Sequence, residues 1–471
     1  MMEDSTQKRP VSSRASGLAL PPQEPGQMDG EQTSLAEPQA WSELLTRGQR
    51  GMRVAANFFL GQGAIQGIGI VSGLLLARTL SLDAYAQFGL AIGFQSVTAI
   101  LMDLGFASTI IPLVGENRDD RALVGRYVRS AKHLRDRSFL IIAPIATVAF
   151  LAVMHRHHWD WKIQAALTCS VLLALYSSGK MSYFSAPLFL YGKLRDYYMP
   201  QVFSGACRLV AYVVLSVVGG LNAWSAAGLS ALNVTLNGML LERKGRTCIN
   251  WPEEESVSTD REIVRYVLPA APASIFSAFQ SQISLFLIGI FGGTADIAQV
   301  AALGRIGALF SVLMTFNAVV VEPYFARLRP RQVMRNYVMV LFGAVVASVP
   351  VVLLAFWHPG TFLWLLGPKY ADLRNNIGWL ILASCINYLA GVMWIMNRAR
   401  KWLFWSGSAM EIGLLLGTQT AFVAFVGVRT VHEAVEFTFV SSFCPLIAHA
   451  YVSVMGFSKS STTNVVPETV S

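Results

Sequence analysis

Long apolar stretches separated by short polar breaks occupy most of the chain between residues 54 and 456. A helix that crosses a bilayer needs about 20 apolar residues. Twelve stretches have about this length, and we expect each of them to form a membrane-spanning helix. They cover residues 54–77, 85–108, 138–154, 163–189, 200–219, 223–241, 264–291, 298–321, 337–357, 376–397, 403–426 and 434–456.

The turn between spans 1 and 2 has a weak copy between spans 7 and 8. The first copy reads LLLARTLSLDAYAQFGLAIG and the second reads LFLIGIFGGTADIAQVAALGR, at an offset of 211 to 212 residues. Upstream of each copy, small and polar residues recur at i, i+3 and i+7, which places them on one face of a helix. They are Gln66, Gly69 and Gly73 in the first half, and Ser277, Gln280 and Ser284 in the second. Similarity at one large offset is typical of transporters built from two repeated halves.

The longest polar break after the N-terminal tail divides the chain into two halves of six spans. The tail has no hydrophobic period and no apolar core of a signal peptide, so we expect it to be disordered. Segment 40–53 fits either an amphipathic surface helix or a simple basic flank of the first span. The expected organisation is a tail over 1–50, a lobe over 51–241, a linker over 242–262, a lobe over 263–457 and a tail over 458–471.

The composition fits a multi-pass membrane protein. Hydrophobic residues make up 54% of the chain and charged residues only 14%, whereas a soluble domain carries about 25% charged residues. The loops on one side of the spans hold 25 Lys and Arg residues, and those on the other side hold six. The first set includes the polar segment 115–137, which we expect to be helical. The positive-inside rule therefore places both termini in the cytoplasm. It also accounts for the net charge of +9 without any nucleic-acid partner.

The sequence contains no motif that points to catalysis, a cofactor or a metal. A P-loop, GxSxG and HExxH are all absent, and the five cysteines have no metal-ligand spacing. The cluster His155, His157 and His158 lies beside Trp159 and Trp161, which fits an aromatic belt at the membrane surface better than a metal site. A membrane polymerase would be expected to need a larger outer loop than residues 358–375.

Ionisable residues inside the spans are the best candidates for function, because each costs about 2.5–3.5 kcal/mol on insertion scales and usually faces protein or a water-filled cavity. Arg305 is the strongest candidate, since it follows the repeated turn and lies roughly 12 Å deep. A buried cation suits an anionic headgroup such as pyrophosphate. The other candidates are Arg208, Lys180, Glu411, Asp103 and Arg78. Glu411 could instead pair with Arg305, Arg208 could pair within its own bundle, and Asp103 and Arg78 could sit at span boundaries for structural reasons.

Four segments resemble, in order, the bacterial polysaccharide-transporter flippases. LLLARTLSLDAYAQFGLA is similar to their first hairpin, and LMDLGFASTIIPLVGE to the Asp-Leu-Gly near the end of their span 2. LYGKLRDYYMPQVFSGACRLVAY resembles their junction of spans 4 and 5. FLWLLGPKYADLRNNIGWLIL resembles their Phe-Gly-x-x-Tyr loop, with Leu366 in the Phe position. The resemblance covers about residues 50–456, and the family belongs to the superfamily of multidrug and oligosaccharidyl-lipid exporters.

The resemblance implies an all-α membrane protein with two six-helix lobes, related by a pseudo-twofold axis around a central cavity. It implies that spans 1, 2, 7 and 8 line this cavity. On these spans the chain offers Gln62, Gln66, Arg78, Asp103, Gln280, Ser284 and Arg305. The implied partners are a lipid-linked oligosaccharide, the membrane and other proteins of polysaccharide assembly.

The resulting hypothesis is a flippase for a polyprenyl-pyrophosphate-linked oligosaccharide in the bacterial inner membrane, which serves exopolysaccharide or lipopolysaccharide synthesis. Two alternatives stay open. An ion-coupled multidrug exporter of the same superfamily needs a protonatable carboxylate deep in a lobe, and Glu411 is the candidate. A membrane polysaccharide polymerase is the second alternative, and it lacks a motif to support it.

Overall fold

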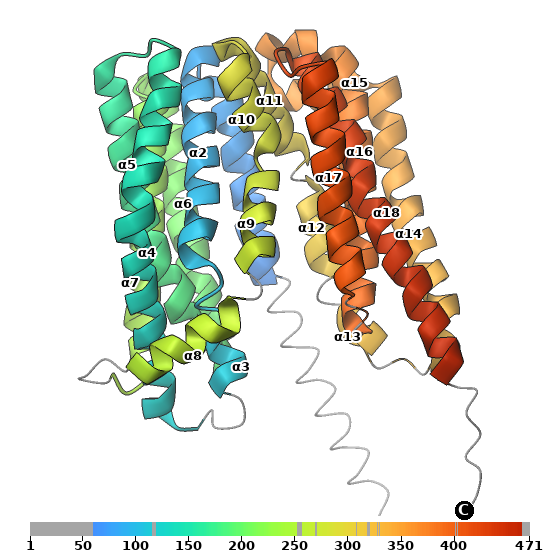
Figure 1. Ribbon diagram of the computed structural model, residues 1–471. Coiled ribbons are helices and arrows are strands. Elements are labelled where there is room, and N and C mark those ends of the chain that lie inside the picture. Colours follow the sequence, from blue (N-terminus) through green and yellow to red (C-terminus); the bar gives the residue numbers. More distant parts are fainter. Residues whose placement is uncertain are drawn as a thin grey trace, which may run out of the picture. The chain divides into compact units, whose positions relative to one another are not determined.

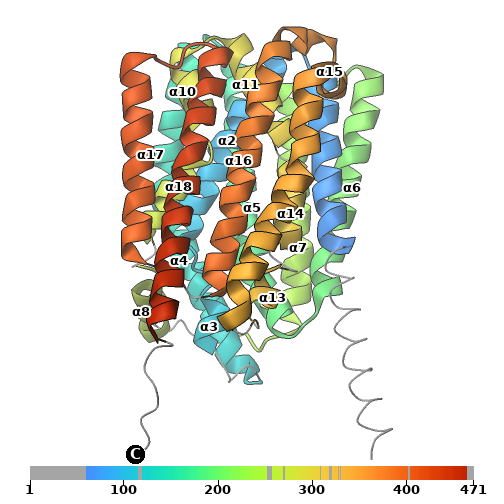
Figure 2. The ribbon, with the colours of Figure 1, turned by 90° about the vertical axis from the view of Figure 1, so that its right-hand side faces the viewer.

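The computed structural model describes residues 60–114, 119–251, 257–268, 271–307, 309–317, 321–326, 328, 330–400, 402 and 404–463. They all belong to one compact unit that begins at Arg53. In these ranges the regular structure is helical throughout, with no strand. The expected tail over 1–50 and surface helix over 40–53 lie outside the described residues. Figures 1 and 2 show long helices that run side by side.

The first half of the unit contains the helices of spans 1 to 6. They are a helix over Leu60–Thr79, α2 (Leu82–Asp103), the short α3 (Ile110–Val114), α4 (Arg121–Arg156), α5 (Trp161–Leu190), α6 (Leu194–Val218) and α7 (Ala223–Arg246). Polar side chains define the helix starts, because they accept hydrogen bonds from the free N–H groups of the first turn. Ser81 caps α2, Asp120 caps α4, and Asn222 forms a capping box with Ser225 at the start of α7.

The second half begins with α8 and contains spans 7 to 12. Its elements are α8 (Val257–Val267), α9 (Ala271–Gln280), α10 (Ile283–Phe291), α11 (Thr294–Gly307), α12 (Leu309–Phe316), α13 (Glu322–Ala326), α14 (Pro330–Trp357), α15 (Pro359–Leu366), the 3-10 helix η2 (Pro368–Leu373), α16 (Arg374–Ala399), α17 (Trp405–Phe425) and α18 (Val431–Thr463). Pro359 starts α15, where its missing N–H would have had no helical partner.

Each predicted span corresponds to a helix or to a pair of helices. Nine helices in the described ranges are long and apolar enough to cross a membrane. The predicted spans 4 and 6 are α5 and α7, which have the length, at 30 and 24 residues, but a less apolar sequence. Span 7 is the pair α9–α10. The protein is therefore a multi-pass, all-α membrane protein.

Four predicted boundaries differ from the structure. Span 2 ends at Asp103 and not at residue 108, because Leu104 and Gly105 adopt positive φ angles of 43° and 93°. The residues expected to start span 7, from 264 onward, instead complete the separate helix α8. Helical structure also extends into the expected linker, up to Arg246, and into the expected C-terminal tail, up to Thr463.

Helix α4 joins the expected polar helix to span 3 without a break. Its 36 residues give a length of about 54 Å, which exceeds the roughly 30 Å of a bilayer core. The N-terminal part of α4 therefore projects beyond the membrane. There α8 packs against it, with a contact of 2.8 Å between His133 and Asp260 and a hydrogen bond of 2.8 Å from the Tyr127 hydroxyl to Glu262.

The two halves form lobes with the same internal packing. In the first lobe α5 packs against α7 and α4, and α6 packs against α7. In the second lobe the corresponding helices make the corresponding contacts: α16 packs against α18 and α14, and α17 packs against α18. Helix α2 packs within the first lobe and also contacts α11 of the second lobe (Figure 1).

The contact between α2 and α11 confirms the repeat read from the sequence. A Cβ atom added to Gly89 would lie 2.6 Å from the Cβ of Ala301, and these residues are equivalent at the offset of 212. A residue close to a twofold axis contacts its own equivalent. Away from the axis, a contact between two residues is repeated between their two equivalents. Gly73 packs against Arg305, and their equivalents Ser284 and Gly93 line one cavity, to which Arg305 also contributes.

The two ends of the unit differ in their elements. One end carries α15, the α10–α11 turn and the turn between the Leu60–Thr79 helix and α2; we call it the α15 end (Figure 1). The opposite end carries α3, α8 and α13, and we call it the α8 end. Trp161, Trp357 and Trp364 are exposed near the α15 end, and Trp405 starts α17. Exposed Trp residues near helix ends are typical of membrane–water interfaces.

Candidate functional site

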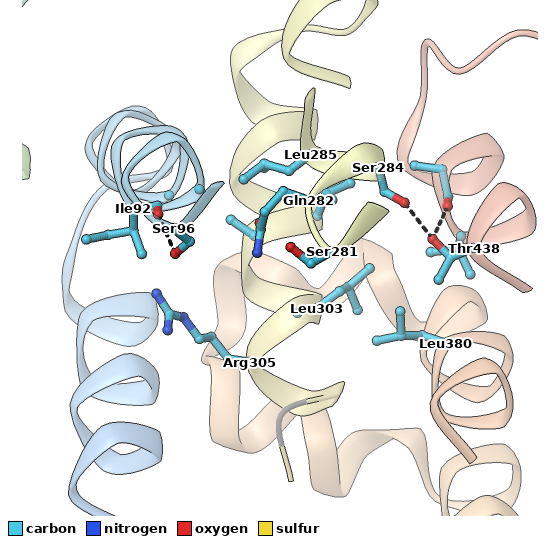
Figure 3. A pocket seen from close by; sticks show the side chains of 17 residues that line it. Ile92, Ser96, Ser281, Gln282, Ser284, Leu285, Leu303, Arg305, Leu380 and Thr438 are labelled. Carbon is cyan, nitrogen blue, oxygen red and sulfur yellow. Dashed lines mark hydrogen bonds between the residues drawn. The ribbon is translucent and has the colours of Figure 1, made fainter. Parts of the chain in front are cut away.

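A cavity of about 370 Å³ lies between α2 and the second lobe (Figure 3). Its walls come from α2, the α9–α10 junction, α11, α16 and α18. The lining residues are Gly89, Ile92, Gly93, Ser96, Ser281, Gln282, Ser284, Leu285, Val300, Ala301, Leu303, Gly304, Arg305, Leu380, Ala434, Val435 and Thr438. Spans 2, 7 and 8 line the cavity as expected, whereas span 1 does not and spans 10 and 12 do.

A break in span 7 creates one wall of the cavity. Helix α9 ends at Gln280 and α10 starts at Ile283, so Ser281 and Gln282 form a turn at membrane depth. The Ser281 hydroxyl donates a hydrogen bond of 2.8 Å to the Ala278 carbonyl, and such local bonds compete with helix formation. Non-helical backbone is tolerated at this depth where it lines a cavity, as in the discontinuous helices of transporters.

The break corrects the expected polar stripe on span 7. Gln280 and Ser284 belong to different helices and therefore do not share one continuous helical face. Ser284 lines the cavity and exchanges a hydrogen bond of 2.9 Å with Thr438 of α18. Gln280 is partly buried outside the lining, and its place is taken by Ser281 and Gln282.

Small hydroxyl groups make up most of the polar lining. Ser96 donates to the Ile92 carbonyl at 2.8 Å, and Thr438 donates to the Ala434 carbonyl at 2.8 Å. These bonds hold the hydroxyls on their own helices while the oxygens still accept hydrogen bonds. Gln282 adds an amide beside Gly93. Together with the apolar side chains, this lining is suited to neutral polar groups such as sugar hydroxyls.

Arg305 is the one charged residue among the lining residues. It follows Gly304, at which a Cβ would meet no atom within 4 Å, so the cavity is open beside it. The aliphatic part of Arg305 packs on the Leu60–Thr79 helix, where a Cβ at Gly73 would lie 3.0 Å from its Cδ. Figure 3 shows the guanidinium pointing toward the side where Ser96 lies. In the described part of the chain it makes no ion pair, and Glu411 is not its partner.

The two glutamines of span 1 lie outside the cavity lining. Gln66 donates a hydrogen bond of 2.7 Å from its Nε2 to the Thr315 hydroxyl of α12, and its Oε1 is buried without a partner. This bond joins the two lobes. Gln62 is partly buried one turn earlier on the same helix. Neither glutamine therefore lines the cavity as expected, and Gln66 instead makes a contact between the lobes.

Asp103 and Lys180 belong to ion pairs inside the first lobe. Asp103 lies 3.3 Å from Arg135, whose side chain is 5% exposed, and accepts a hydrogen bond of 3.0 Å from Ser182. Lys180 pairs at 2.8 Å with Glu242, which also binds Arg246. None of these residues lines the cavity. The partners of each pair come from neighbouring helices of the first lobe.

Arg78 belongs to a contact between the lobes at the α15 end. It is exposed at its helix end and lies 5.6 Å from the Trp364 ring centroid. Next to it, the Lys369 ammonium donates to the Leu80 carbonyl, and the fully buried rings of Tyr85 and Tyr370 meet edge to face with centroids 6.4 Å apart. The Phe-Gly-x-x-Tyr-like loop thus closes the unit at this end.

Glu411 and the histidine cluster make no described cavity contacts. Glu411 is partly buried on α17, which does not line the cavity. The His157 Nε2 donates a hydrogen bond of 2.8 Å to the Gly289 carbonyl of α10, a further contact between the lobes at the α15 end. Among the described residues no group of His, Cys, Asp or Glu has the arrangement of a metal site.

Four polar cavity residues were missed by the sequence analysis: Ser96, Ser281, Gln282 and Thr438. The run Gln280-Ser281-Gln282 in the middle of an apolar span was a usable signal, because three adjacent polar residues point to all sides of a helix. Single hydroxyl residues such as Ser96 and Thr438 leave no such signal, since they are common on membrane helices.

Several solved structures share the fold of this chain. An inward-facing multidrug resistance MATE family transporter of the MOP superfamily has a TM-score of 0.61 at 12% identity, over 85% of this chain and 95% of that one. The eukaryotic MATE transporter AtDTX14 has a TM-score of 0.60 at 14% identity, over 88% and 98%. The lipid II flippase MurJ, in an inward closed conformation, has a TM-score of 0.60 at 12% identity, over 86% and 90%. The chain therefore has the fold of the MOP superfamily.

The sequence places the chain more narrowly. The family of polysaccharide biosynthesis proteins matches residues 54–329, more than half of the chain, and the chain belongs to this family. No curated protein sequence matches it. The resemblance read from the four sequence segments is confirmed.

Proposed function

We propose that the protein is a flippase that moves a polyprenyl-pyrophosphate-linked oligosaccharide from the cytoplasmic to the outer face of the bacterial inner membrane. The product would serve exopolysaccharide or lipopolysaccharide synthesis. The family, whose name refers to polysaccharide biosynthesis, and the fold shared with the lipid II flippase MurJ support a lipid-linked glycan as substrate.

The charge of the cavity is the observation that carries the proposal. Among the described lining residues there is one cation, Arg305, and no carboxylate. A buried guanidinium binds phosphate oxygens through paired, charge-assisted hydrogen bonds. The surrounding hydroxyls and the Gln282 amide suit sugar hydroxyl groups. An exporter of cationic drugs would instead need an anionic cavity, and Glu411 lies on a helix that does not line it.

Two observations together support an inward-facing state: the distribution of Lys and Arg, and the contacts between the lobes at the α15 end. The loops at the α8 end carry the excess of cations, so the positive-inside rule assigns that end, with both termini, to the cytoplasm. The contacts of Arg78, Lys369, Tyr370 and His157 hold the lobes together at the opposite, α15 end. A volume of 370 Å³ is at the small end of ligand sites, so we expect the lobes to part further at the α8 end when a glycan binds.

The direct test measures the lipid-linked oligosaccharide pool in a deletion strain, with its sidedness probed in sealed vesicles. We expect completed repeat units to accumulate on the cytoplasmic face. Complementation with Arg305→Gln should leave the accumulation in place, whereas Arg156→Gln, a change of an exposed cation at the end of α4, should restore export.

An unchanged pool and sidedness, in a strain without a redundant transporter, would contradict the flippase. A gain in drug susceptibility of the same strain would then favour the ion-coupled exporter. Full export by normally expressed Arg305→Gln would contradict only the role of Arg305.

A further inference from the structure

An apolar hollow of about 620 Å³ lies on the surface of the first lobe, between α6 and α7. Its lining is apolar throughout and comes from α6, except for Leu229 of α7. The side chains of Ala206, Cys207 and Ala211 are small, so they leave space beside the larger Phe203 on the same helix. We call this hollow the α6–α7 groove.

The groove continues toward the α8 end into a second hollow of about 450 Å³, which has a charged lining. Phe203 borders both hollows, so they adjoin each other. The second hollow is lined by Arg195 and Asp196 at the start of α6 and by Lys244 near the end of α7. Lys244 pairs with Asp196 at 3.2 Å, whereas Arg195 makes no ion pair in the part of the chain that the structure describes. This charged mouth therefore holds one cation that is not neutralised.

The mouth and the adjoining part of the groove have the length of one membrane leaflet. Val210, which lines the groove, lies 15 residues after Arg195 on α6, and this separation corresponds to about 22 Å along a helix. Half of a bilayer with its headgroups measures about 20–22 Å. With Arg195 at the headgroups, Val210 lies close to the middle of the bilayer. The positive-inside rule assigns this end, and hence this leaflet, to the cytoplasm.

The groove faces away from the rest of the first lobe and from the cavity. Tyr198 and Gly205, seven positions apart on α6, contact the Leu60–Thr79 helix. Phe203 and Val210, also seven positions apart, line the groove. The two pairs are offset by five positions, which is a rotation of about 140° around the helix. Changes in the groove are therefore separated from the cavity by the whole width of α6.

We propose that the α6–α7 groove and its charged mouth bind one anionic phospholipid of the cytoplasmic leaflet. The phosphate accepts charge-assisted hydrogen bonds from Arg195 and Lys244, and one acyl chain fills the apolar groove. Basic pockets between membrane helices on the cytoplasmic side are suited to anionic headgroups in this way. The proposal does not rest on the proposed function, because the site lies outside the cavity.

The charge of the mouth selects the class of lipid. A lipid with a neutral headgroup would fill the groove but leave Arg195 without an anion. A bound phosphate would neutralise Arg195 and share Lys244 with Asp196. It would thereby join the start of α6 to the end of α7, two ends that meet at the membrane surface. A ligand that binds only the folded protein stabilises it, so this lipid should also raise the unfolding temperature.

The experiment counts lipids on the purified full-length protein in detergent by native mass spectrometry. Dioleoyl phosphatidylglycerol is the anionic probe, and dioleoyl phosphatidylcholine has the same chains without the net charge. We expect the wild type to retain one phosphatidylglycerol in preference to phosphatidylcholine and to unfold at a higher temperature with it. Equal retention of the two lipids by the wild type would overturn the proposal.

Variants of the mouth test the charges. Arg195→Gln and Lys244→Gln should each weaken phosphatidylglycerol binding by about fivefold, as for the loss of one cation near a membrane surface. Asp196→Asn should tighten it, because it releases Lys244. Arg243→Gln changes an exposed cation next to Lys244 that does not line the mouth, and it should bind like the wild type. Wild-type binding by both Arg195→Gln and Lys244→Gln would overturn the proposal.

A variant of the groove tests the acyl chain without a change of charge. Ala206→Phe fills the groove and should abolish the preferred phosphatidylglycerol. Val217→Phe adds similar bulk to an exposed position on the same helix outside the groove, so it should retain the lipid. Thermal unfolding without added lipid checks that both variants are folded. Retention of the lipid by Ala206→Phe would contradict an acyl chain in the groove.

The same spectra distinguish the other possible occupants. A wild-type dimer that is lost in Ala206→Phe would assign the groove to a second copy of the chain and overturn the lipid site. Displacement of phosphatidylglycerol by a much lower concentration of a polyprenyl phosphate would assign it to an isoprenoid carrier and also overturn the proposal. Phosphatidylglycerol that persists against an equal concentration of polyprenyl phosphate supports the phospholipid.

Discussion

The contact of Lys369 with the first lobe provides a test of which end of the protein is closed. The Lys369 ammonium, on η2 of the second lobe, donates to the Leu80 carbonyl at the end of the first helix of the first lobe. It is half-buried, and it also lies 5.4 Å from the Tyr370 ring centroid. Lys369→Met removes the donor but keeps an apolar stem of similar length.

The expected size of the effect follows from the type of bond. A hydrogen bond to a charged group contributes about 1.5–3 kcal/mol. Because this bond exists only while the lobes meet at the α15 end, its loss should raise the ratio of outward-open to closed molecules by about 10- to 150-fold. The remaining contacts, such as the rings of Tyr85 and Tyr370, persist in the variant.

The assay uses a cysteine placed at Gly304, which borders the cavity and has open space at its Cβ position. In a protein whose five native cysteines are replaced, a membrane-impermeant maleimide is added from outside to spheroplasts. Lys369→Met should speed labelling of Gly304→Cys, whereas Lys162→Met, which changes an exposed lysine on α5, should not. Unchanged labelling in Lys369→Met would refute the assignment of this contact as one that holds the outer end closed.

Three further predictions follow from single contacts. Asp103→Ala leaves Arg135 buried without its anion, so it should lower the free energy of unfolding in detergent by about 3–5 kcal/mol. The double variant Asp103→Ala/Arg135→Met should regain part of the lost stability. A loss below about 1 kcal/mol in Asp103→Ala would mean that the pair is effectively solvated. In Gly304→Leu the new side chain would enter open space in the cavity, so the variant should keep its thermal stability but fail to export. Export at the wild-type rate would show that the substrate takes another path. Gly73→Val should reduce export as much as Arg305→Gln because it displaces that side chain, and this is checked by comparing glycolipid pools at equal expression.

The two repeats differ at one cavity position. Gly93 of α2 and Arg305 of α11 are equivalent in the repeat, and both line the cavity. Gly73 packs against Arg305, whereas its equivalent, Ser284, lines the cavity beside Gly93. The repeat therefore has a small residue in α2 where it has an arginine in α11, and only α11 brings a charge to the cavity at this position.

The sequence by itself indicated the multi-pass, all-α class and the family of the protein. Runs of about 20 apolar residues can only be buried in lipid or in a helical bundle, so the expectation of membrane-spanning helices followed from local pattern. Of the candidate site residues, Arg305 and Ser284 line the cavity of the structure. The family motifs marked the loop around Tyr370, which contacts the first lobe at the α15 end.

Only the tertiary structure decided which polar residues face the cavity and which face one another. A charge inside a span signals that a partner exists but not where it lies: Asp103 and Lys180 found Arg135 and Glu242 within the first lobe, while Arg305 found none among the described residues. The break of span 7 at Ser281 also escaped the periodic pattern. These outcomes depend on contacts between helices far apart in sequence, and local spacing carries no information about them.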